Sequence, residues 1–268
     1  MKIVLIGAGN LATNLGKSLL SVGHDILQVY SRTMESASKL ASSLGGSPVT
    51  DIAEVRDDAD LYILSVKDSV LPDLIPQLCV GKQSKVFLHT AGSVSMDVFK
   101  GMALHYGVFY PMQTFSKSKT VDFRQIPCFI ESVDAYTHTL VEGLAHELSD
   151  RVYELTSEQR RYLHLSAVFA CNFVNHCYAI SGEILQKHGI PFDVMLPLID
   201  ETAQKVHVLN PVDAQTGPAV RYDENIIREQ ASLLRDNPFL KDIYERMSMD
   251  IHRMDLKAKA NKNNKEAL

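Results

Sequence analysis

The sequence lacks the residue patterns on which several enzyme classes and metal sites depend. None of its four cysteines stands in a Cys-x-x-Cys pair, and its ten histidines form no His-Glu-x-x-His motif. We therefore expect reduced cysteines and no metal site. The sequence also has no Tyr-x-x-x-Lys pair, no Gly-x-Ser-x-Gly motif and no phosphate-binding P-loop. These absences disfavour the short-chain dehydrogenase mechanism, the serine nucleophile of a Gly-x-Ser-x-Gly turn and phosphate binding at a P-loop.

Charge of one sign and uninterrupted apolar runs are also scarce. The net charge is -5 at pH 7 and the pI is about 6.0, which favours neither nucleic acid nor an anionic membrane as a partner. The most apolar stretch, 163–180, contains polar side chains and does not resemble a membrane span. The first residues read as a strand rather than as a signal peptide, so we expect a cytoplasmic protein.

The pattern of apolar residues predicts two domains in the 268-residue chain. Up to residue 155, strands alternate with helices, which is typical of an α/β fold with a doubly wound parallel sheet, the Rossmann type. Beyond it only helices are indicated, so we expect a helical domain over 156–256 and a flexible, lysine-rich tail over 257–268. The expected strands lie near 2–7, 26–31, 60–66, 85–89, 104–109, 127–131 and 150–155, and the expected helices near 10–22, 33–44, 68–79, 94–100, 134–149, 157–188, 192–209, 223–235 and 238–256.

A glycine-rich turn follows the first strand and predicts a dinucleotide site. The sequence runs Gly7-Ala8-Gly9-Asn10-Leu11-Ala12, a Gly-x-Gly-x-x-Ala pattern between a buried strand and a helix. Gly7 permits the tight turn, Gly9 lets the backbone approach a pyrophosphate, and Ala12 keeps the helix close to the sheet. The alternative is a glycine turn without a ligand.

The residues after the second strand indicate which dinucleotide binds. An NAD enzyme usually places an acidic residue there, but this chain has Ser31 and Arg32. A guanidinium beside a hydroxyl suits a 2′-phosphate, so the sequence favours NADP(H). A solvated Arg32 in a loop is the alternative.

Other candidate residues lie at the ends of later strands, where ligands bind in open α/β sheets. Ser65, Val66 and Lys67 lie at the end of the third expected strand, and His89 ends the fourth. His89 is a candidate proton donor or else a histidine bonded to the backbone. Tyr110 offers a further polar group at a strand end.

The long helix after residue 156 carries a row of polar residues. At about 100° per residue, its side chains His164, Asn172, Asn175 and His176 all fall on one side of the helix. On a buried helix such groups need partners, either a substrate or other protein groups, as at a dimer interface. We take His89, His164 and Asn172 as the candidate substrate-side residues.

Several of these motifs resemble known NADP enzymes. The glycine turn, Ser31-Arg32, Ser65-Val66-Lys67 and the helical second half resemble the pyrroline-5-carboxylate reductase group, which includes deazaflavin-dependent NADP reductases. More closely, the chain resembles a bacterial family of NADP oxidoreductases whose helical C-terminal domain has no assigned function. The segments that carry this closer resemblance are His89-Thr90-Ala91-Gly92-Ser93, Pro111-Met112-Gln113-Thr114-Phe115 and Thr216-Gly217-Pro218-Ala219-Val220-Arg221.

The resemblance implies a Rossmann domain, a helical dimerisation domain and an active site between them. By position, it implies that the pyrophosphate is held by Gly7, Gly9, Asn10 and Leu11, the 2′-phosphate by Ser31 and Arg32, and the ribose side by Ser65, Val66 and Lys67. Two departures affect catalysis. Val168 and Cys171 occupy the positions, four before Asn172 and Asn175, where β-hydroxyacid dehydrogenases use lysine, and Tyr110 stands where the closer family more often has histidine.

Together these observations predict a homodimeric NADP(H)-dependent oxidoreductase that transfers hydride between the nicotinamide and a small carbonyl or imine substrate. Two alternatives remain open. The first is a sensor or scaffold that binds NADP(H) without catalysis, and the second is a structural dimer with a vestigial site.

Overall fold

An eight-stranded sheet organises the first part of the chain, in the order β3-β2-β1-β4-β5-β6-β7-β8. Neighbouring strands are parallel except β6 and β7, which pair antiparallel. The strands are β1 (Lys2–Ile6), β2 (Asp25–Tyr30), β3 (Ser47–Val49), β4 (Leu61–Leu64), β5 (Val86–His89), β6 (His105–Pro111), β7 (Cys128–Ser132) and β8 (Val152–Glu154). The chain order reverses between β1 and β4, the point where dinucleotides bind in doubly wound sheets.

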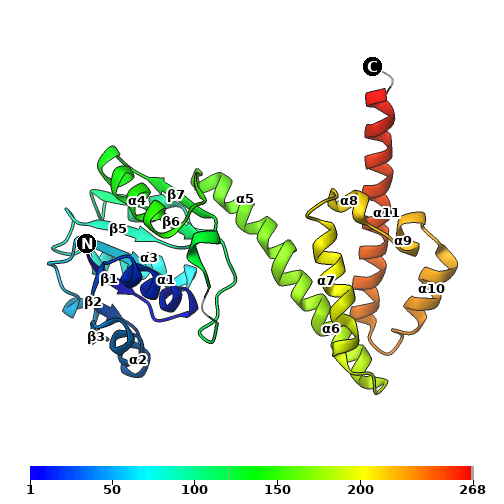
Figure 1. Cartoon of the computed structure of the whole chain (residues 1–268), viewed down its shortest axis with the longest axis horizontal. Helices are drawn as coiled ribbons and strands as arrows, with labels where there is room; N and C mark the ends of the chain where they lie inside the picture. Colours follow the sequence, from blue (N-terminus) through cyan, green and yellow to red (C-terminus); the bar gives the residue numbers. More distant parts are fainter. Residues whose placement is uncertain (120, 267–268) are drawn as a thin grey trace. The chain divides into compact units, whose positions relative to one another are not determined.

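The computed structural model describes residues 1–119 and 121–266 (Figure 1). Two units are distinguished: unit 1, Met1–Asn175, which contains the sheet, and unit 2, which begins at His176. This division lies beyond the expected one at residue 156, because the first turns of the long helical stretch bond to the sheet through Arg160. The roles expected for 1–155 and 156–256 remain predictions.

Helices cover both faces of the sheet in unit 1, with α1 (Asn10–Ser21), α2 (Met34–Leu44) and α4 (Ala135–Leu148) on one face and α3 (Leu71–Leu78) on the other. A further helix, α5 (Ser157–Ala167), follows β8. Short 3₁₀ helices lie at Ile52–Glu54, Asp68–Val70, Met96–Phe99 and Phe123–Gln125. Residues Val168–Phe173 follow α5 as a π-helical stretch, which we call the π segment.

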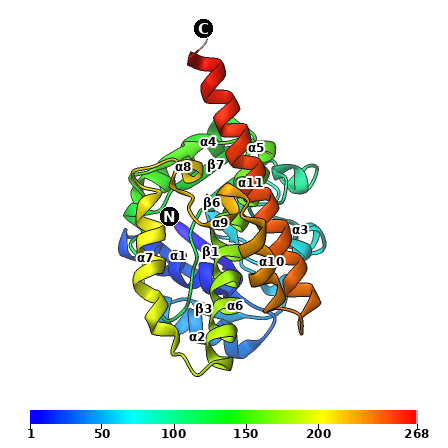
Figure 2. The same cartoon turned by 90° about the vertical axis from the view of Figure 1, so that its right-hand side faces the viewer.

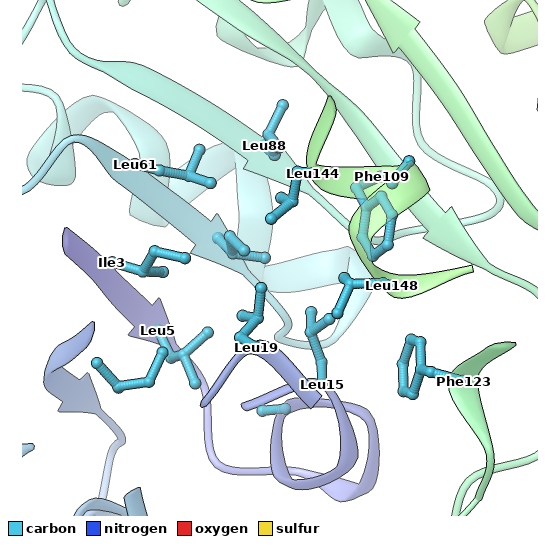
Figure 3. Close-up of a cluster of buried hydrophobic side chains, with 14 of the residues drawn as sticks. Ile3, Leu5, Leu15, Leu19, Leu61, Leu88, Phe109, Phe123, Leu144 and Leu148 are labelled. Carbon is cyan, nitrogen blue, oxygen red and sulfur yellow. The ribbon is translucent and has the colours of Figure 1, made fainter. Parts of the chain in front are cut away.

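Two apolar layers sandwich the sheet because successive strand residues face opposite sides. Ile3 and Leu5 of β1 pack towards α1, α2 and α4, whereas Val4 and Ile6 pack towards α3. Figure 3 shows the first layer, in which Leu15 and Leu19 of α1 and Leu144 and Leu148 of α4 approach the strand residues; all four are buried. The predicted doubly wound α/β sheet is confirmed.

The secondary-structure elements of unit 2 are all helices among its described residues, joined by turns and loops (Figure 2). Its helices are α6 (Val174–Lys187), which starts at the end of unit 1, a 3₁₀ turn (Phe192–Met195), α7 (Leu196–Lys205), α8 (Pro211–Ala214), α9 (Pro218–Arg221), α10 (Glu224–Ser232) and α11 (Pro238–Glu266). This confirms the expected helical region. No helix in the described part of the chain is long and apolar enough to cross a bilayer.

Several observed elements differ from the expected ones. Ser47–Val49 forms an edge strand that was not expected, because proline is unusual in strands. Proline is nevertheless tolerated at sheet edges. The helix expected near 94–100 is a 3₁₀ turn. The last helix continues to Glu266 instead of ending near 256, because this part contains good helix formers and pairs such as Lys259 with Asp255. Residues 267–268 of the expected tail lie outside the described residues.

Candidate functional site

The turn between β1 and α1 requires glycine at its first position. Gly7 has φ of +123°, a conformation that other residues rarely adopt, and a Cβ there would lie 2.2 Å from the backbone oxygen of Ser65. The turn is held by a hydrogen bond from the Gly7 N–H to the oxygen of Tyr30, at 2.8 Å. Gly7 is therefore fixed by the fold itself.

Gly9 has no such requirement, and this difference points to a ligand. Its backbone is extended, with φ of -78°, and a Cβ added to it would meet nothing within 4 Å. No side chain caps the N-terminus of α1, so the first N–H groups of the helix remain available. A glycine that packing does not need, in front of an uncapped helix, fits a pyrophosphate that approaches the backbone.

Asn10 and Leu11 open α1 with side chains that are directed to the protein. The Asn10 amide donates to the oxygen of Phe115 at 2.9 Å, and the Asn14 amide donates to the oxygen of Ser116 at 3.0 Å. These bonds hold the loop that follows β6 against the start of α1. Leu11 packs against the apolar layer. Any contact of these two residues with a phosphate would therefore use their backbone N–H groups.

Ser31 and Arg32 lie just beyond β2. The Ser31 N–H donates to the oxygen of Val49 at 3.1 Å, which fixes the backbone at the strand end. Arg32 is exposed and forms no ion pair with any described residue. Its guanidinium is therefore available to an anion such as a 2′-phosphate.

Ser65, Val66 and Lys67 follow β4, the strand beside β1. The Ser65 N–H donates to the oxygen of Ile6 at 2.8 Å, and Val66 lies against Gly7. Lys67 is exposed. The structure thus brings these residues to the glycine turn, at the reversal of strand order where the cofactor crevice is expected.

His89 ends β5 inside the protein. Its side chain is fully buried, stacks on Phe99 at a centroid distance of 5.9 Å, and accepts a hydrogen bond from the Ala91 N–H at 3.1 Å. Burial, together with the nearby positive charge of Arg160, lowers the pKa of His89 to about 3. A ring that stays neutral and contacts only protein is poorly suited to donate a proton, so the geometry favours the backbone-bonded alternative.

His164 occupies a different position, at the ends of β5 and β6. Its Nδ1 lies 3.0 Å from the Tyr110 hydroxyl, and the two rings meet edge to face at a centroid distance of 6.0 Å. A Cβ at Gly92 would lie 2.4 Å from the same Nδ1. We call these two side chains the Tyr110–His164 pair; sequence reasoning placed Tyr110 at a strand end but not in contact with His164.

A buried arginine holds this part of α5 on the sheet. Arg160 is 1% exposed, forms an ion pair with Glu131 of β7, and donates to the oxygens of Ala91 at 3.3 Å and Val94 at 2.5 Å. The same carboxylate accepts from the backbone and the hydroxyl of Ser157, both at 2.7 Å. Such a satisfied buried charge pair fixes orientation more than it adds stability.

Among the described residues, no hydrogen bond links Asn172, Asn175 or His176 to the Tyr110–His164 pair. Asn172 lies in the π segment, and Asn172, Asn175 and His176 are exposed. The expected alignment assumed about 100° per residue. The wider π turns change that angle, so the row of polar residues does not continue regularly beyond residue 167. Whether Asn172 contacts substrate remains a prediction.

Another group of side chains was not expected from the sequence. The possible ligand atoms of His138, Glu142 and Glu154 lie within 4.8 Å of one another on α4 and β8. The two glutamates are largely exposed and pair with the histidine at 3.7 Å. None of the three forms a hydrogen bond or ion pair with the glycine turn or with the Tyr110–His164 pair among the described residues.

The comparisons with known proteins agree with this geometry. Residues 2–91 match the family described as "NADP oxidoreductase coenzyme F420-dependent", and residues 126–251 match a domain of unknown function. A crystal structure from Bacteroides fragilis, described as a "putative NADP oxidoreductase", has 54% sequence identity, covers 94% of this chain and 98% of its own, and superposes with a TM-score of 0.90. The chain belongs to this NADP oxidoreductase family. NADP(H) is the cofactor of the family, as the sequence predicted. No curated protein matches the chain.

More distant structures share the fold of this NADP oxidoreductase. An imine reductase from Myxococcus stipitatus in complex with NADP⁺ has 15% identity, coverage of 96% of this chain and 95% of its own, and a TM-score of 0.67. A pyrroline-5-carboxylate reductase from Coxiella burnetii has 16% identity, with coverage of 95% and 97% and a TM-score of 0.56. At these identities the likeness establishes the fold alone.

Proposed function

We propose that this protein is an NADP(H)-dependent oxidoreductase that transfers hydride between the nicotinamide and a small carbonyl or imine substrate. The observation that carries the proposal is the contrast between Gly7, which the fold requires, and Gly9, which neither backbone conformation nor packing requires and which the approach of a pyrophosphate would explain. The available Arg32 beyond β2 supports the phosphorylated form of the dinucleotide.

The chain's own residues divide the binding task along the strand ends. The backbone at Gly7, Gly9, Asn10 and Leu11 holds the pyrophosphate, Ser31 and Arg32 bind the 2′-phosphate, and Ser65, Val66 and Lys67 line the ribose side. When bound, NADPH supplies a hydride at its nicotinamide ring. His164 and Asn172 remain the proposed substrate-side residues, whereas His89 supports the loop after β5.

A homodimer belongs to the same proposal. In unit 2 the described side chains that are buried are Ala231 and Ser248, while large apolar side chains remain exposed, including Leu198 at 59% and Val208 at 81%. Apolar surface of this extent marks an interaction site, and a second copy of the chain offers the same complementary surface. A cytoplasmic location likewise remains a prediction.

The second candidate function is a sensor or scaffold that binds NADP(H) without catalysis. It is favoured by Val168 and Cys171, which stand where related β-hydroxyacid dehydrogenases use a lysine. Oxidation of NADPH that depends on an added carbonyl or imine compound excludes this candidate.

The first experiment is a titration of the purified protein with NADPH and, separately, with NADH. We expect tighter binding of NADPH and a loss of about 1–3 kcal/mol for NADPH alone in Arg32→Ala, because the variant removes a charged partner of the 2′-phosphate. Arg56→Ala is the matched control, since Arg56 is also exposed but is paired with Asp58. Equal losses for both dinucleotides contradict the NADP assignment, and binding of neither contradicts the dinucleotide site.

A further inference from the structure

Tyr110 and His164 come from elements 54 residues apart and meet at the carboxyl ends of the central strands. Tyr110 lies in the buried run of β6, one residue before its end, and is 9% exposed, while His164 on α5 is half-buried. The Tyr110 hydroxyl has no other hydrogen-bond partner among the described side chains and backbone groups. Nδ1 of His164 is therefore occupied, whereas its Nε2 has no protein partner there and is not buried.

The loop after β5 is shaped around this ring. Gly92 is buried and does not have a positive φ, so its backbone conformation does not demand glycine. A Cβ there would come within 2.4 Å of Nδ1 and 2.7 Å of Cγ of His164. Glycine at this position thus serves the close approach of the imidazole, which ties the ring to the strand end as well as to Tyr110.

The placement of the ring is also reinforced from its own helix. Arg160 lies four residues before His164, on the same face of α5. Its bonds to Glu131 and to the oxygens of Ala91 and Val94 fix that face against the loop after β5. The ring of His164 is therefore held by two contacts, Tyr110 and Gly92, while the Arg160 anchor holds the helix that carries it.

From this geometry we infer that Tyr110 is a positioning residue for His164, and that His164 donates a proton through Nε2 to the oxygen or nitrogen of the substrate. This inference rests on the proposed function, because the proton is needed only when hydride is added to a carbonyl or a neutral imine. A hydroxyl suits the positioning role, since it accepts from a protonated Nδ1 and donates to an unprotonated one.

Reduction of a ketone adds one hydride and one proton across its C=O bond. Bound NADPH would supply the hydride to the carbonyl carbon, and the electron pair of the C=O π bond would move to oxygen. That oxygen takes the proton from Nε2 of protonated His164, which becomes neutral and keeps its Nδ1–H on the Tyr110 oxygen. The products are the alcohol and NADP⁺, and Nε2 then regains a proton from solvent.

The other charged groups near the pair do not change the assignment of His164 as the proton donor. Burial first and the charge of Asp68 second raise the pKa of Tyr110, which keeps the phenol protonated, although Arg160 opposes this. Asp68 itself accepts a hydrogen bond from Ser93, and Arg160 is paired with Glu131. His89, the other nearby histidine, faces the protein interior. His164 is thus the group left to carry the proton.

The pair is tested first without any substrate. In protein labelled with ¹⁵N-histidine, two-bond ¹H–¹⁵N spectra report the ring nitrogens, and the His164 signals are those lost in His164→Gln. We expect Tyr110→Phe to shift both ring nitrogens of His164. Tyr106→Phe is the matched control, because Tyr106 is also buried in β6 and its hydroxyl has no hydrogen bond with a described residue. Unchanged His164 signals in Tyr110→Phe overturn the pair.

Proton donation is tested with two kinds of probe, cyclic ketones and N-methylated cyclic iminium ions of the same ring size. The iminium ion carries its charge permanently and gains hydride without a proton. The measured quantity is the ratio of the NADPH oxidation rate with the ketone to the rate with the iminium ion. We expect this ratio to fall about 10²–10⁴-fold in His164→Gln. The ratio should fall at least about tenfold in Tyr110→Phe and stay unchanged in Tyr106→Phe.

A ratio that stays constant in both site variants overturns proton donation. If the wild-type protein oxidises NADPH with neither probe, the carbonyl and imine chemistry fails and proton donation fails with it. The histidine spectra distinguish that result from a failure of the pair, because they require neither cofactor nor substrate.

Discussion

Unit 1 and unit 2 bury their apolar side chains to very different degrees. In unit 1, both faces of the sheet are covered, and side chains such as Ile3, Leu5 and Phe109 are fully buried. In unit 2, Phe239 is 74% exposed and Val208 81%. Because burial of apolar surface is the main favourable term in folding, unit 1 has the core of an independent domain. Unit 2 leaves large apolar side chains exposed, which agrees with the proposed homodimer.

The largest expected effect separates the cores of the two units. Phe109→Ala should lower the free energy of unfolding by about 3–5 kcal/mol, because it opens a cavity in a dry layer. Phe239→Ala removes the same side chain from an exposed position in unit 2 and should cost less than about 1 kcal/mol in dilute protein. Urea denaturation, followed by circular dichroism, measures both. Similar losses would contradict the difference between the units.

A second, smaller effect is a pH dependence that originates in the core of unit 1. The folded-state pKa of His89 is about 3, below the ordinary value of 6.5. Between these values the unfolded chain binds a proton that the folded chain does not, so stability falls as the pH falls through this window. At pH 5 the loss from His89 is about 2 kcal/mol.

Denaturation at pH 7 and pH 5 measures this loss. His89→Asn should unfold with a pH dependence shallower by that amount, because it removes the titrating ring. The control is His188→Gln in unit 2, where the side chain is exposed. An unchanged pH dependence in His89→Asn would show that the ring takes up its proton without disturbing the fold.

The smallest expected effect concerns unit 2 and protein concentration. If a second copy covers its helices, a hundredfold dilution lowers stability by about 2.7 kcal/mol per dimer, or about 1.4 kcal/mol per chain. Hydrogen exchange at two concentrations should then show faster exchange in α7 and α11 of the dilute sample, with β1, β4 and β5 unchanged. Exchange that is independent of concentration in all these elements argues against the dimer.

The sheet could be predicted from the sequence because its strands are short, continuous apolar runs. Residues 2–6 and 61–64 read as buried strands, and the glycine turn fixes how the first of them continues. The edge strand Ser47–Val49 could not be found in this way, since its length and its proline resemble a loop. The continuation of α11 could not be predicted, because a lysine-rich and asparagine-rich composition is also typical of disorder; local ion pairs support the helix.

The candidate site was predictable only where it depends on neighbours in sequence. The glycine turn and Arg32 follow from local spacing. The Tyr110–His164 pair depends on the packing of α5 against the sheet, which no spacing reveals. His89 was a reasonable candidate by position, but its ionisation depends on burial and on Arg160, a residue distant in sequence. The π segment likewise leaves no reliable sequence signal, and it changes the expected direction of Asn172.

The contact between Gly92 and His164 links the inheritance of two positions. Any glycine codon becomes an alanine codon by one base change, but the new methyl group would occupy the place of the imidazole. In a lineage that keeps histidine at position 164, this change to alanine is therefore not tolerated. A lineage that gives up the ring is free to acquire a side chain at position 92.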